Sequence, residues 1–432
     1  MTPEIEKRIK AVQAGRVPAG YKKSKVGIVP KEWGEVRFHD MFSRVVRKNK
    51  EGNTNVLTIS AQCGLINQND FFNKTVASDD KSNYYLMEKG EFAYNKSYSN
   101  GYPFGALKRL DFYDKGIVSP LYICFAANEN NKCPDFYVHY FEAGLVNGEI
   151  QAFAQEGARN HGLLNISVDD FFNSNLLNPP IGEQKKIAEI LATQDRVIEL
   201  KEKLIAEKQS QKKYLMSVLL GDDFKKPFKL NGVTIDKKKW EKKKIGEVCD
   251  NYTGLTYAPE DVSSKGVLVL RSSNIQNGRL CFDDNVYVDM EIPARSKVKI
   301  GDILVCVRNG SRSLIGKSAI ITKEAENAAF GAFMTVLRSK NVDQLFLFYI
   351  WQSNYIQKQI KVLMGALINQ ITSFDIQHLH FSCPTPPEQK AIADVLSAVD
   401  EEISLLQKGL EQEKLKKKSL MQLLLTGLVR VQ

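Results

Sequence analysis

Residues 183–220 read EQKKIAEILATQDRVIELKEKLIAEKQSQKKYLMSVLL, and residues 388–425 read EQKAIADVLSAVDEEISLLQKGLEQEKLKKKSLMQLLL. The two stretches align without a gap at a constant offset of 205, and 16 of their 38 positions are identical. A repeat of this period is too long to be the unit of a solenoid. It indicates a duplicated domain in which each copy ends in a long helix.

Both stretches have the pattern of a long amphipathic helix, since they contain no proline and only one glycine, Gly409. Their apolar residues recur at seven-residue steps, which is typical of helices that pack in a coiled coil. At 1.5 Å per residue, each helix would be roughly 57 Å long. The helix-pairing positions that we predict are Leu191, Ile198, Ile205 and Leu219 in the first copy, and Leu396, Ile403, Leu410 and Leu424 in the second.

The apolar stripe of the first copy is interrupted by polar residues, namely Gln194, Lys201, Lys208 and Lys212. These interruptions disfavour a long homodimeric coiled coil, because polar seam positions weaken such a pairing. The other copy, with the same spacing, is then the natural partner. We favour helices that pack on each other and hold two similar domains a fixed distance apart. The alternative is that each helix lies in a separate core.

Length and composition indicate a globular chain with a polyanionic partner. The 432 residues suffice for two or three domains with sizeable cores. The formal charge is +10, which favours a polyanion without identifying it. The seven cysteines form no C-x-x-C pair, and we expect reduced core thiols rather than a zinc site or disulfide framework. With no apolar signal region and no 18-residue apolar window, we expect a cytoplasmic protein.

The remaining sequence predicts two mainly β domains, each preceded by a turn-rich connector and a tryptophan, Trp33 or Trp240. A short helix is expected at 2–14, with Thr2 as its cap, Pro3 in its first turn and Gly15 after its end. Alternating apolar residues predict strands at 36–38, 54–60, 91–94, 117–125 and 136–141, and at 267–271, 286–289, 303–308, 318–322 and 333–338. A helix is predicted over 343–364. The expected divisions are 1–30 (helix and connector), 31–178 (first domain), 179–221 (first long helix), 222–382 (second domain) and 383–432 (second long helix).

Two motifs that are similar to enzyme signatures lack essential parts of them. Asn178-Pro179-Pro180-Ile181 is similar to the adenine-binding motif of N6-adenine methyltransferases, but isoleucine stands in place of the aromatic residue. We interpret it as the start of the long helix. NGSRSLIGKS (309–318) is similar to a phosphate-binding loop, but five residues rather than four separate its glycines. The lysine run 237–244 is either a solvated face or a phosphate contact.

Several further segments match one known family in their order along the chain. These are VPKEW (29–33), NGYPFG (100–105), RNHGLLNIS (159–167), and INQIT (368–372) followed by PPEQKAIADVLS (386–397). Together with the two helix copies they resemble the specificity subunit of type I restriction-modification systems, over essentially the whole chain. The resemblance implies an α+β fold with two mainly β target-recognition domains, each followed by a long helix. It also implies that the two helices pair as an antiparallel coiled coil with pseudo-two-fold symmetry.

The resemblance further implies a non-catalytic, DNA-binding subunit that reads a bipartite target. Its partners would be double-stranded DNA, two adenine methyltransferase subunits, and two restriction/translocase subunits in the full complex. The paired helices would set the half-site spacing. S-adenosylmethionine, ATP and Mg²⁺ would belong to the partner subunits, and this chain would hold no cofactor, metal or catalytic residue.

Candidate DNA-binding residues are chosen by their position in basic, turn-rich segments. Arginine can bond guanine bidentately and asparagine can do the same to adenine, so these residue types are favoured in such segments. The candidates are Lys96, Tyr98, Asn100, Lys108, Arg159, Asn160 and His161 in the first domain, and Arg271, Asn274, Arg308, Asn309, Arg312, Lys317, Asn369 and Gln370 in the second. Asn165 and Asn369 are alternatively caps of the segments that lead to the long helices.

Other functions remain open at the level of the sequence. One is a coiled-coil scaffold without sequence-specific DNA function, which would tolerate loss of Arg308 and Arg312. Another is a self-contained enzyme, which would be active as an isolated chain. A third is the specificity protein of a modification-only or phase-variable system.

Overall fold

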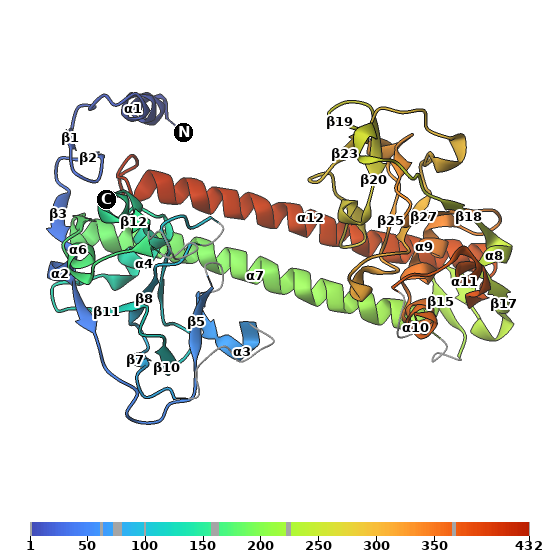
Figure 1. The fold of residues 1–432 in the computed structure, drawn as a ribbon, viewed down its shortest axis with the longest axis horizontal. Helices are drawn as coiled ribbons and strands as arrows, with labels where there is room; N and C mark the ends of the chain where they lie inside the picture. Colours follow the sequence, from blue (N-terminus) through green and yellow to red (C-terminus); the bar gives the residue numbers. More distant parts are fainter. Residues whose placement is uncertain are drawn as a thin grey trace. The chain divides into compact units, whose positions relative to one another are not determined.

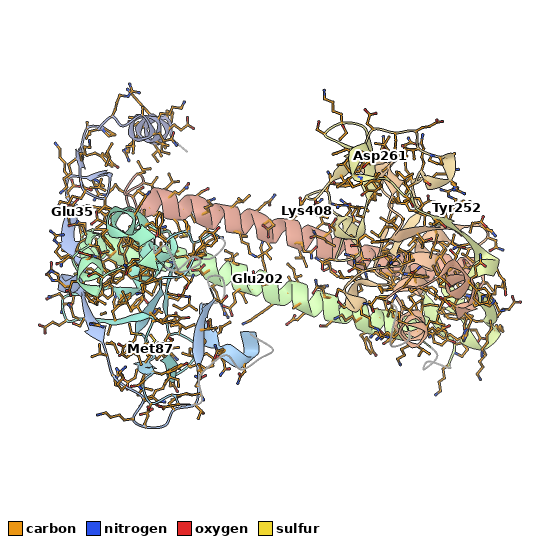
Figure 2. All side chains as sticks on the ribbon, in the orientation of Figure 1. Glu35, Met87, Glu202, Tyr252, Asp261 and Lys408 are labelled. Atoms are coloured by element: carbon orange, nitrogen blue, oxygen red, sulfur yellow. The ribbon has the colours of Figure 1, made fainter. Side chains whose placement is uncertain are left out.

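The structure is a computed structural model that describes residues 2–60, 64–71, 80–98, 101–156, 164–221, 226–364 and 369–431. It contains two compact units (Figure 1). The first unit comprises Met1–Lys201 and Gly409–Gln432, and the second comprises Glu202–Lys408. Glu202 and Lys408, labelled in Figure 2, are the first and last residues of the second unit.

Two long helices contribute to both units. Helix α7 spans Ile181–Leu220 and helix α12 spans Pro386–Leu424, with 40 and 39 residues. These bounds confirm the two helices predicted from the repeat. The first half of α7 and the second half of α12 belong to the first unit, and the remaining halves belong to the second unit.

A four-stranded antiparallel sheet forms the centre of each unit. In the first unit the strands are β4 (Phe42–Val45), β11 (Ile123–Ala127), β8 (Phe92–Asn95) and β9 (Ala106–Arg109), in that order. In the second unit the order is β18 (Cys249–Thr253), β27 (Met334–Ser339), β24 (Ile303–Cys306) and β25 (Ser318–Ile320). The two sheets have the same connectivity, so the duplication extends from the helices into the domain bodies.

Smaller elements surround these sheets. In the first unit they are α1 (Pro3–Gln13), the pairs β1–β2 (Tyr21–Lys23, Ile28–Pro30), β3–β14 (Gly34–Arg37, Asn175–Asn178), β5–β6 (Leu57–Ser60, Gly64–Asn67), β7–β10 (Tyr85–Glu88, Lys115–Val118) and β12–β13 (Gln155–Glu156, Leu164–Asn165), and helices α2 (Phe38–Met41), α3 (Gln68–Phe71), α4 (Pro134–Glu142), α5 (Asn147–Phe153) and α6 (Val168–Phe172). In the second unit they are β15–β16 (Phe228–Leu230, Val233–Ile235), β17–β28 (Glu241–Lys244, His380–Cys383), β21–β22 (Ile275–Gln276, Arg279–Leu280), the sheet β19–β23–β20–β26 (Val262–Ser263, Val286–Val288, Val267–Leu270, Ala329–Phe330), and helices α8 (Ile245–Val248), α9 (Gln344–Gln352), α10 (Asn354–Leu363) and α11 (Ser373–His378).

The tryptophan before each domain anchors it to the first turn of the long helix that follows. The Trp33 indole donates a 2.9 Å hydrogen bond to the Glu183 carboxylate, and the Trp240 indole donates one of 3.2 Å to Glu388. Glu183 and Glu388 are equivalent in the helix repeat, and both are buried. A buried carboxylate requires such partners, because an unpaired charge away from water is costly.

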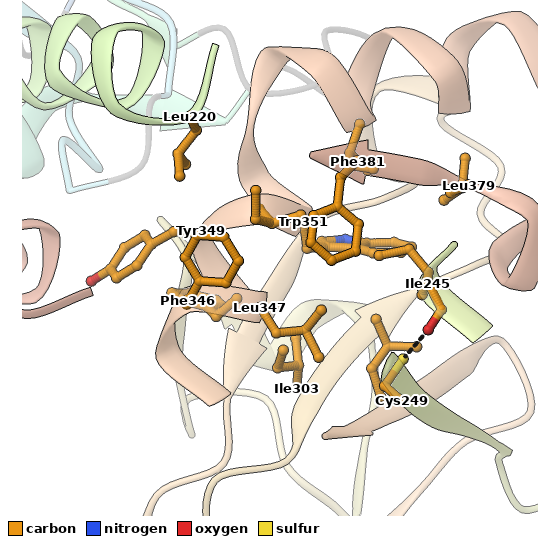
Figure 3. Close-up of a cluster of buried hydrophobic side chains, with 14 of the residues drawn as sticks. Leu220, Ile245, Cys249, Ile303, Phe346, Leu347, Tyr349, Trp351, Leu379 and Phe381 are labelled. Atoms are coloured by element: carbon orange, nitrogen blue, oxygen red, sulfur yellow. Dashed lines mark hydrogen bonds between the residues drawn. The ribbon is translucent and has the colours of Figure 1, made fainter. Parts of the chain in front are cut away.

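The hydrophobic cores use the ends of the long helices. In the first unit, Leu191 from α7 and Leu424 from α12 belong to one buried cluster with Trp33, Phe38 and Phe125. In the second unit, Leu220 from α7 packs in the cluster that surrounds Trp351, together with Phe346 and Phe381 (Figure 3). The stripe residues near the helix ends are therefore core residues of the domains.

Three predicted elements differ in the structure. Residues 136–141, predicted as a strand, lie in helix α4, where Pro134 occupies the first turn. Aromatic residues favour strands in general, but here Phe136, Tyr137, Tyr140 and Phe141 are buried on several sides of a helix, so tertiary packing decides. The predicted strand 117–125 is divided between β10 and β11, and the predicted helix 343–364 is interrupted at Ser353, which caps α10.

The N-terminal helix, Pro3–Gln13, lies within the predicted range 2–14 but lacks the predicted cap. Pro3 lies in the first turn and Gly15 has a φ of 69°, as expected, while the Thr2 side chain makes no capping hydrogen bond. Across the described residues, no helix combines the length and apolar character needed to cross a membrane. The six described cysteines are unpaired, and all but Cys281 are buried. Cys63 lies outside the described residues.

Candidate nucleic-acid interface

The two main sheets carry a turn at the same place, and these turns contain many of the predicted DNA-binding residues. The first turn, residues 96–105, joins β8 to β9, and the second, residues 307–316, lies between β24 and β25. We call them the first loop and the second loop. Each has ten residues, and their sequences, KSYSNGYPFG and VRNGSRSLIG, share only the final glycine at equivalent positions.

The shared glycine is required by the backbone. Gly105 has a φ of 80° and Gly316 a φ of 84°, a conformation that side chains disfavour. A Cβ atom on Gly105 would also lie 2.2 Å from the Asn95 carbonyl oxygen. In the second unit, the indole of Trp351 donates a 2.8 Å hydrogen bond to the Gly316 carbonyl. The end of each loop is thus held by the fold, while the other nine positions differ.

A second segment lies beside each loop. The Leu164 N–H donates to the Lys96 carbonyl at 3.1 Å, and the Ile371 N–H donates to the Val307 carbonyl at 2.9 Å. Leu164 and Ile371 belong to the segments around RNHGLLNIS and INQIT that the sequence aligns at the offset of 205. Residues far apart in the chain are thereby brought together at the equivalent edge of each domain.

In the second unit, this arrangement brings four predicted residues into one group. Arg308 and Gln370 form an isolated antiparallel bridge. The Asn309 N–H donates to the Asn369 carbonyl at 3.4 Å, and the Asn369 side chain donates to the Gly310 carbonyl at 3.2 Å. The Asn309 side chain also donates to Ser272 Oγ at 3.0 Å, which connects the loop to the segment after β20.

A cleft of about 580 Å³ lies next to this group in the second unit. Its lining includes Arg271, Ser272, Asp284 and Phe333. Arg271 is paired with Asp284 at 2.8 Å, so its charge is already compensated. The Arg308 guanidinium lies over the Phe333 ring, 4.9 Å from the ring centroid.

Three predicted residues of the second unit have structural contacts. Asn274 is wholly buried, and its side chain donates to the Cys281 carbonyl at 3.0 Å, so its assignment as a DNA contact is wrong. The Lys317 ammonium donates to the Ile275 carbonyl at 2.9 Å, and burial lowers its pKa. The Arg312 guanidinium bonds the Met364 carbonyl.

In the first unit, Lys96 and Tyr98 lie in the first loop, and Tyr98 is 61% exposed. Lys108 is instead in a half-buried ion pair with Glu142, whose other carboxylate oxygen accepts a 2.9 Å hydrogen bond from Tyr102. Burial by itself raises the pKa of the Glu142 carboxyl. Lys108 and the Tyr102 hydrogen bond lower this pKa by a larger amount, so the net pKa lies below its usual range. Lys108 therefore stabilises the domain rather than facing a ligand. Asn100, Arg159, Asn160 and His161 lie outside the described residues.

Asn165 and Asn369, predicted as alternative helix caps, do not cap the helices that lead to the long helices. Short helices α6 and α11 precede the last strand of each domain, and they are capped by Ser167 and Thr372. These two residues are equivalent at the offset of 205. Asn178 accepts a hydrogen bond from Gln184 at 2.7 Å, consistent with its interpretation as part of the start of the long helix.

The lysine run 237–244 mainly makes contacts within its own unit. Lys237 donates to the Val218 and Gly221 carbonyls at the end of α7, where a cation stabilises the helix dipole. Lys239 pairs with Asp236, and Lys243 pairs with Glu241. These contacts favour the structural interpretation of the run.

The helix-pairing positions vary in burial, and the polar residues between them contact the opposite helix. Leu191, Ile205, Leu219, Leu396, Ile403, Leu410 and Leu424 are buried, and Ile198 is half-buried. In the first unit, Gln194 and Lys201 of α7 bind Glu413 of α12 at 2.9 and 3.2 Å. In the second unit, Lys208 pairs with Glu402 and Lys212 with Asp400, each at 2.7 Å. Within each unit the residue numbers run in opposite directions, so the paired segments are antiparallel.

Sequence reasoning missed Phe333, whose ring lies under the Arg308 guanidinium. It also missed the ion pairs of the equivalent residues Asp195 and Asp400 with Lys417 and Lys212. It also missed the partners of Glu91 and Asp302, which follow Gly90 and Gly301. Each of these carboxylates accepts the N–H three residues earlier, and each binds an arginine, Arg47 or Arg338. The repeated Gly-acid pair was a usable signal for this turn, whereas no local signal identifies the arginines.

Known proteins share both the sequence and the fold. The model of the type I restriction modification DNA specificity domain matches residues 30–208 and again residues 237–415. The type I restriction enzyme MjaVIII specificity subunit of Methanocaldococcus jannaschii is 28% identical over 331 residues, covering 73% of this chain and 75% of that protein. The putative MjaX specificity subunit of the same organism is 26% identical over 429 residues, covering 95% and 97%. The EcoKI specificity subunit of Escherichia coli is 32% identical over 184 residues, covering 40% and 39%.

Solved structures show the same fold at low sequence identity. A chain of a type I R-M system complex has a TM-score of 0.55 at 15% identity, covering 93% of this chain and 99% of that chain. The type I restriction-modification S subunit from M. genitalium has a TM-score of 0.53 at 14% identity, covering 91% and 96%. Since the family model matches twice, over most of the sequence, this chain belongs to the family of type I restriction-modification specificity subunits, with two copies of the DNA specificity domain.

Proposed function

We propose that this chain is the sequence-reading subunit of a type I restriction-modification complex and that each unit reads one half of a bipartite DNA target. The observation that carries the proposal is the pair of loops. They have equal length and an equivalent place in the fold, yet nine of their ten residues differ. A duplicated scaffold with different loops is suited to reading two different sequences, because scaffold residues hold position while loop side chains determine base contacts.

The loops and their neighbouring segments carry groups that suit DNA. Arg308 and Asn309 in the second loop are types that bond guanine and adenine edges, and Lys96 and Tyr98 occupy the first loop. The formal charge of +10 supports phosphate binding along the rest of the surface. Of the predicted DNA contacts, we retain Lys96, Tyr98, Arg271, Arg308, Asn309, Arg312, Asn369 and Gln370, together with those outside the described residues.

The long helices are proposed to dock two adenine methyltransferase subunits, with restriction/translocase subunits joining in a full nuclease. Leu200 on α7 and Leu405 on α12 are equivalent in the repeat, and they are 49% and 62% exposed. Two equivalent exposed leucines suit two copies of one partner, since each copy could bury the same kind of apolar contact. The helices are also proposed to set the distance between the half-sites.

The decisive experiment is methylome sequencing of a host that carries this chain with its neighbouring methyltransferase. We expect a bipartite motif with adenine methylation in both halves. Deleting this chain alone should abolish that methylation, and restoring it from a plasmid should return the same motif. A methylome that is unchanged by the deletion, although the methyltransferase is expressed and active, would contradict the proposal.

A further inference from the structure

The second unit contains a stacked pair of exposed side chains, Arg308 and Phe333, at one end of its main sheet. Strands β24 and β27 pair up to Cys306 and Met334, and the two residues lie just beyond this ladder. The Phe333 carbonyl accepts hydrogen bonds from the N–H groups of Val307 and Arg308, at 3.0 and 3.2 Å. The backbone thus fixes the origins of both side chains, and the guanidinium lies 4.9 Å from the centroid of the ring.

Arg308 differs from neighbouring arginines because, within the described residues, its guanidinium makes neither an ion pair nor a hydrogen bond. Arg271 is paired with Asp284 and Arg338 with Asp302, while Arg279 bonds the Asp400 carbonyl. Arg308 is exposed, and the ring that supports it is 54% exposed. A stacked guanidinium with free N–H donors in a fixed plane is prepared for a planar acceptor that offers two lone pairs.

The surroundings favour a base edge as that acceptor. The cleft of about 580 Å³ is lined by Phe333, and its wall includes Ser272, which holds the Asn309 amide. Arg308 therefore lies beside this cleft, and Asn309, a second polar residue, is fixed next to it. The arginine fork can also bind a phosphate, but guanine presents O6 and N7 in the plane and spacing of that fork, and the adjacent cleft offers space for a base.

We infer that Phe333 positions the Arg308 guanidinium to read a guanine in the half-site bound by the second unit. Phe333 is then a specificity-determining residue although its side chain has no hydrogen-bonding atom. This inference rests on the proposed DNA-reading function. The loop alignment places Ser97 at the position of Arg308, and the strand registers place Leu121 at the position of Phe333. The equivalent place in the first unit therefore has neither the arginine nor the aromatic ring, and the other half-site provides an internal control.

The test is methylation by the complete complex of this chain with its methyltransferase. The substrates are duplexes in which each base pair of the second half-site is changed in turn. We expect Phe333→Ala to lower discrimination at one guanine position by about fivefold or more, since a good bidentate contact contributes discrimination of that order. The first half-site should be read as before, and Phe333→Tyr, which keeps the ring, should restore discrimination.

Arg308→Lys is a second variant that tests the same contact. It changes an exposed side chain, so the fold should be kept, and it retains the positive charge. If Arg308 reads guanine, this variant relaxes the same position, whereas a change at a phosphate contact would affect all duplexes alike. Phe374→Ala is the matched control, since Phe374 is a 68% exposed phenylalanine of the same unit and lies outside the loops. It should leave the target unchanged.

Three outcomes would overturn the inference. Unchanged discrimination in Phe333→Ala and Arg308→Lys would show that the pair reads no base. A uniform loss over all duplexes, with a weaker salt dependence, would identify a phosphate contact. Loss of methylation on both half-sites would identify a role in folding. If methylation by the wild-type complex did not depend on this chain, the proposed function itself would fail. That outcome is distinct from failure of the inference about Phe333 and Arg308.

Discussion

Asp195 and Asp400 are equivalent residues of the two long helices, and each joins three elements of its unit. In the first unit, Asp195 lies 2.5 Å from Lys417 of α12 and 3.7 Å from His139 of α4. In the second unit, Asp400 lies 2.7 Å from Lys212 of α7 and accepts a 2.9 Å hydrogen bond from Tyr349 of α9. Each aspartate therefore connects a domain helix to both long helices.

We expect the two junctions to respond differently to pH, because only the first contains a histidine. His139 is buried, and this burial lowers its pKa; Asp195, Glu142 and Asp135 oppose the shift, while Lys417 adds to it. The folded state therefore binds a proton less readily than the unfolded chain. The stabilising contribution is complete above the unfolded pKa of about 6.5, and it is lost as the pH falls from there towards the folded pKa.

We expect His139→Gln to reduce this acid sensitivity. The free energy of unfolding, measured with denaturant between about pH 5 and 8, should fall with acid less steeply in the variant than in the wild type. The exposed His378→Gln is the control and should retain the wild-type slope. If the curves of unfolding free energy against pH ran parallel for His139→Gln and the wild type, His139 would bind protons equally well in the folded and unfolded states.

At the level of elements, the polar residues of the helix stripe specify the partner. Gln194 is 5% exposed, and its amide donates to both the carbonyl and the carboxylate of Glu413. Lys201 binds the same carboxylate at 3.2 Å. Polar seam residues of this kind permit only partners that satisfy them, so they select the other helix of the same chain over a second copy of α7.

Replacing both residues, Gln194→Leu with Lys201→Leu, should therefore produce self-association. The continuous apolar stripe would pair with any similar helix. The unfolding free energy should fall, because the Glu413 carboxylate loses both of its partners on α7. Light scattering coupled to size-exclusion chromatography measures the mass. Glu207→Leu adds a leucine at an exposed position and should change nothing. A double variant with the wild-type mass would contradict this role.

At the scale of the whole molecule, the continuous helices are proposed to determine how far apart the half-sites lie. Lys201 contacts the Gly409 carbonyl, and Lys208 pairs with Glu402. Glu202 and Gln407 are equivalent in the repeat and lie between these contacts. An insertion after each of them would therefore keep both sets of helix contacts in register.

We expect seven residues inserted after Glu202, together with seven after Gln407, to lengthen the spacer of the methylated motif by about three base pairs. Seven residues preserve the heptad and add about 10 Å of helix, and DNA rises about 3.4 Å per base pair. Both half-site sequences should remain. Seven residues inserted after the exposed Glu129 serve as the control and should not change the spacer. A folded double-insertion variant with the original spacing would show that the helices do not set it.

Local patterns were enough to predict the long helices, their duplication and the family. Their heptads recur over 38 residues, so the helical period outweighs any single polar position. Short strands such as β8 and β24 were also predictable from their apolar runs. The segment 136–141 was not, because aromatic residues suit both strands and buried helices, and only the surrounding core selects α4.

The candidate site was predictable in part. The loops were identified by their glycines and basic residues, which are local features of the sequence. The burial of Asn274 and the ion pair between Lys108 and Glu142 were not, because a side chain's exposure depends on residues distant in the chain. The sequence by itself determined the helices, the repeat and the loop positions, since each depends on neighbouring residues. Only the tertiary structure decided that Phe333 supports Arg308 and that His139 meets Asp195, because these contacts join residues brought together by the packing of separate elements.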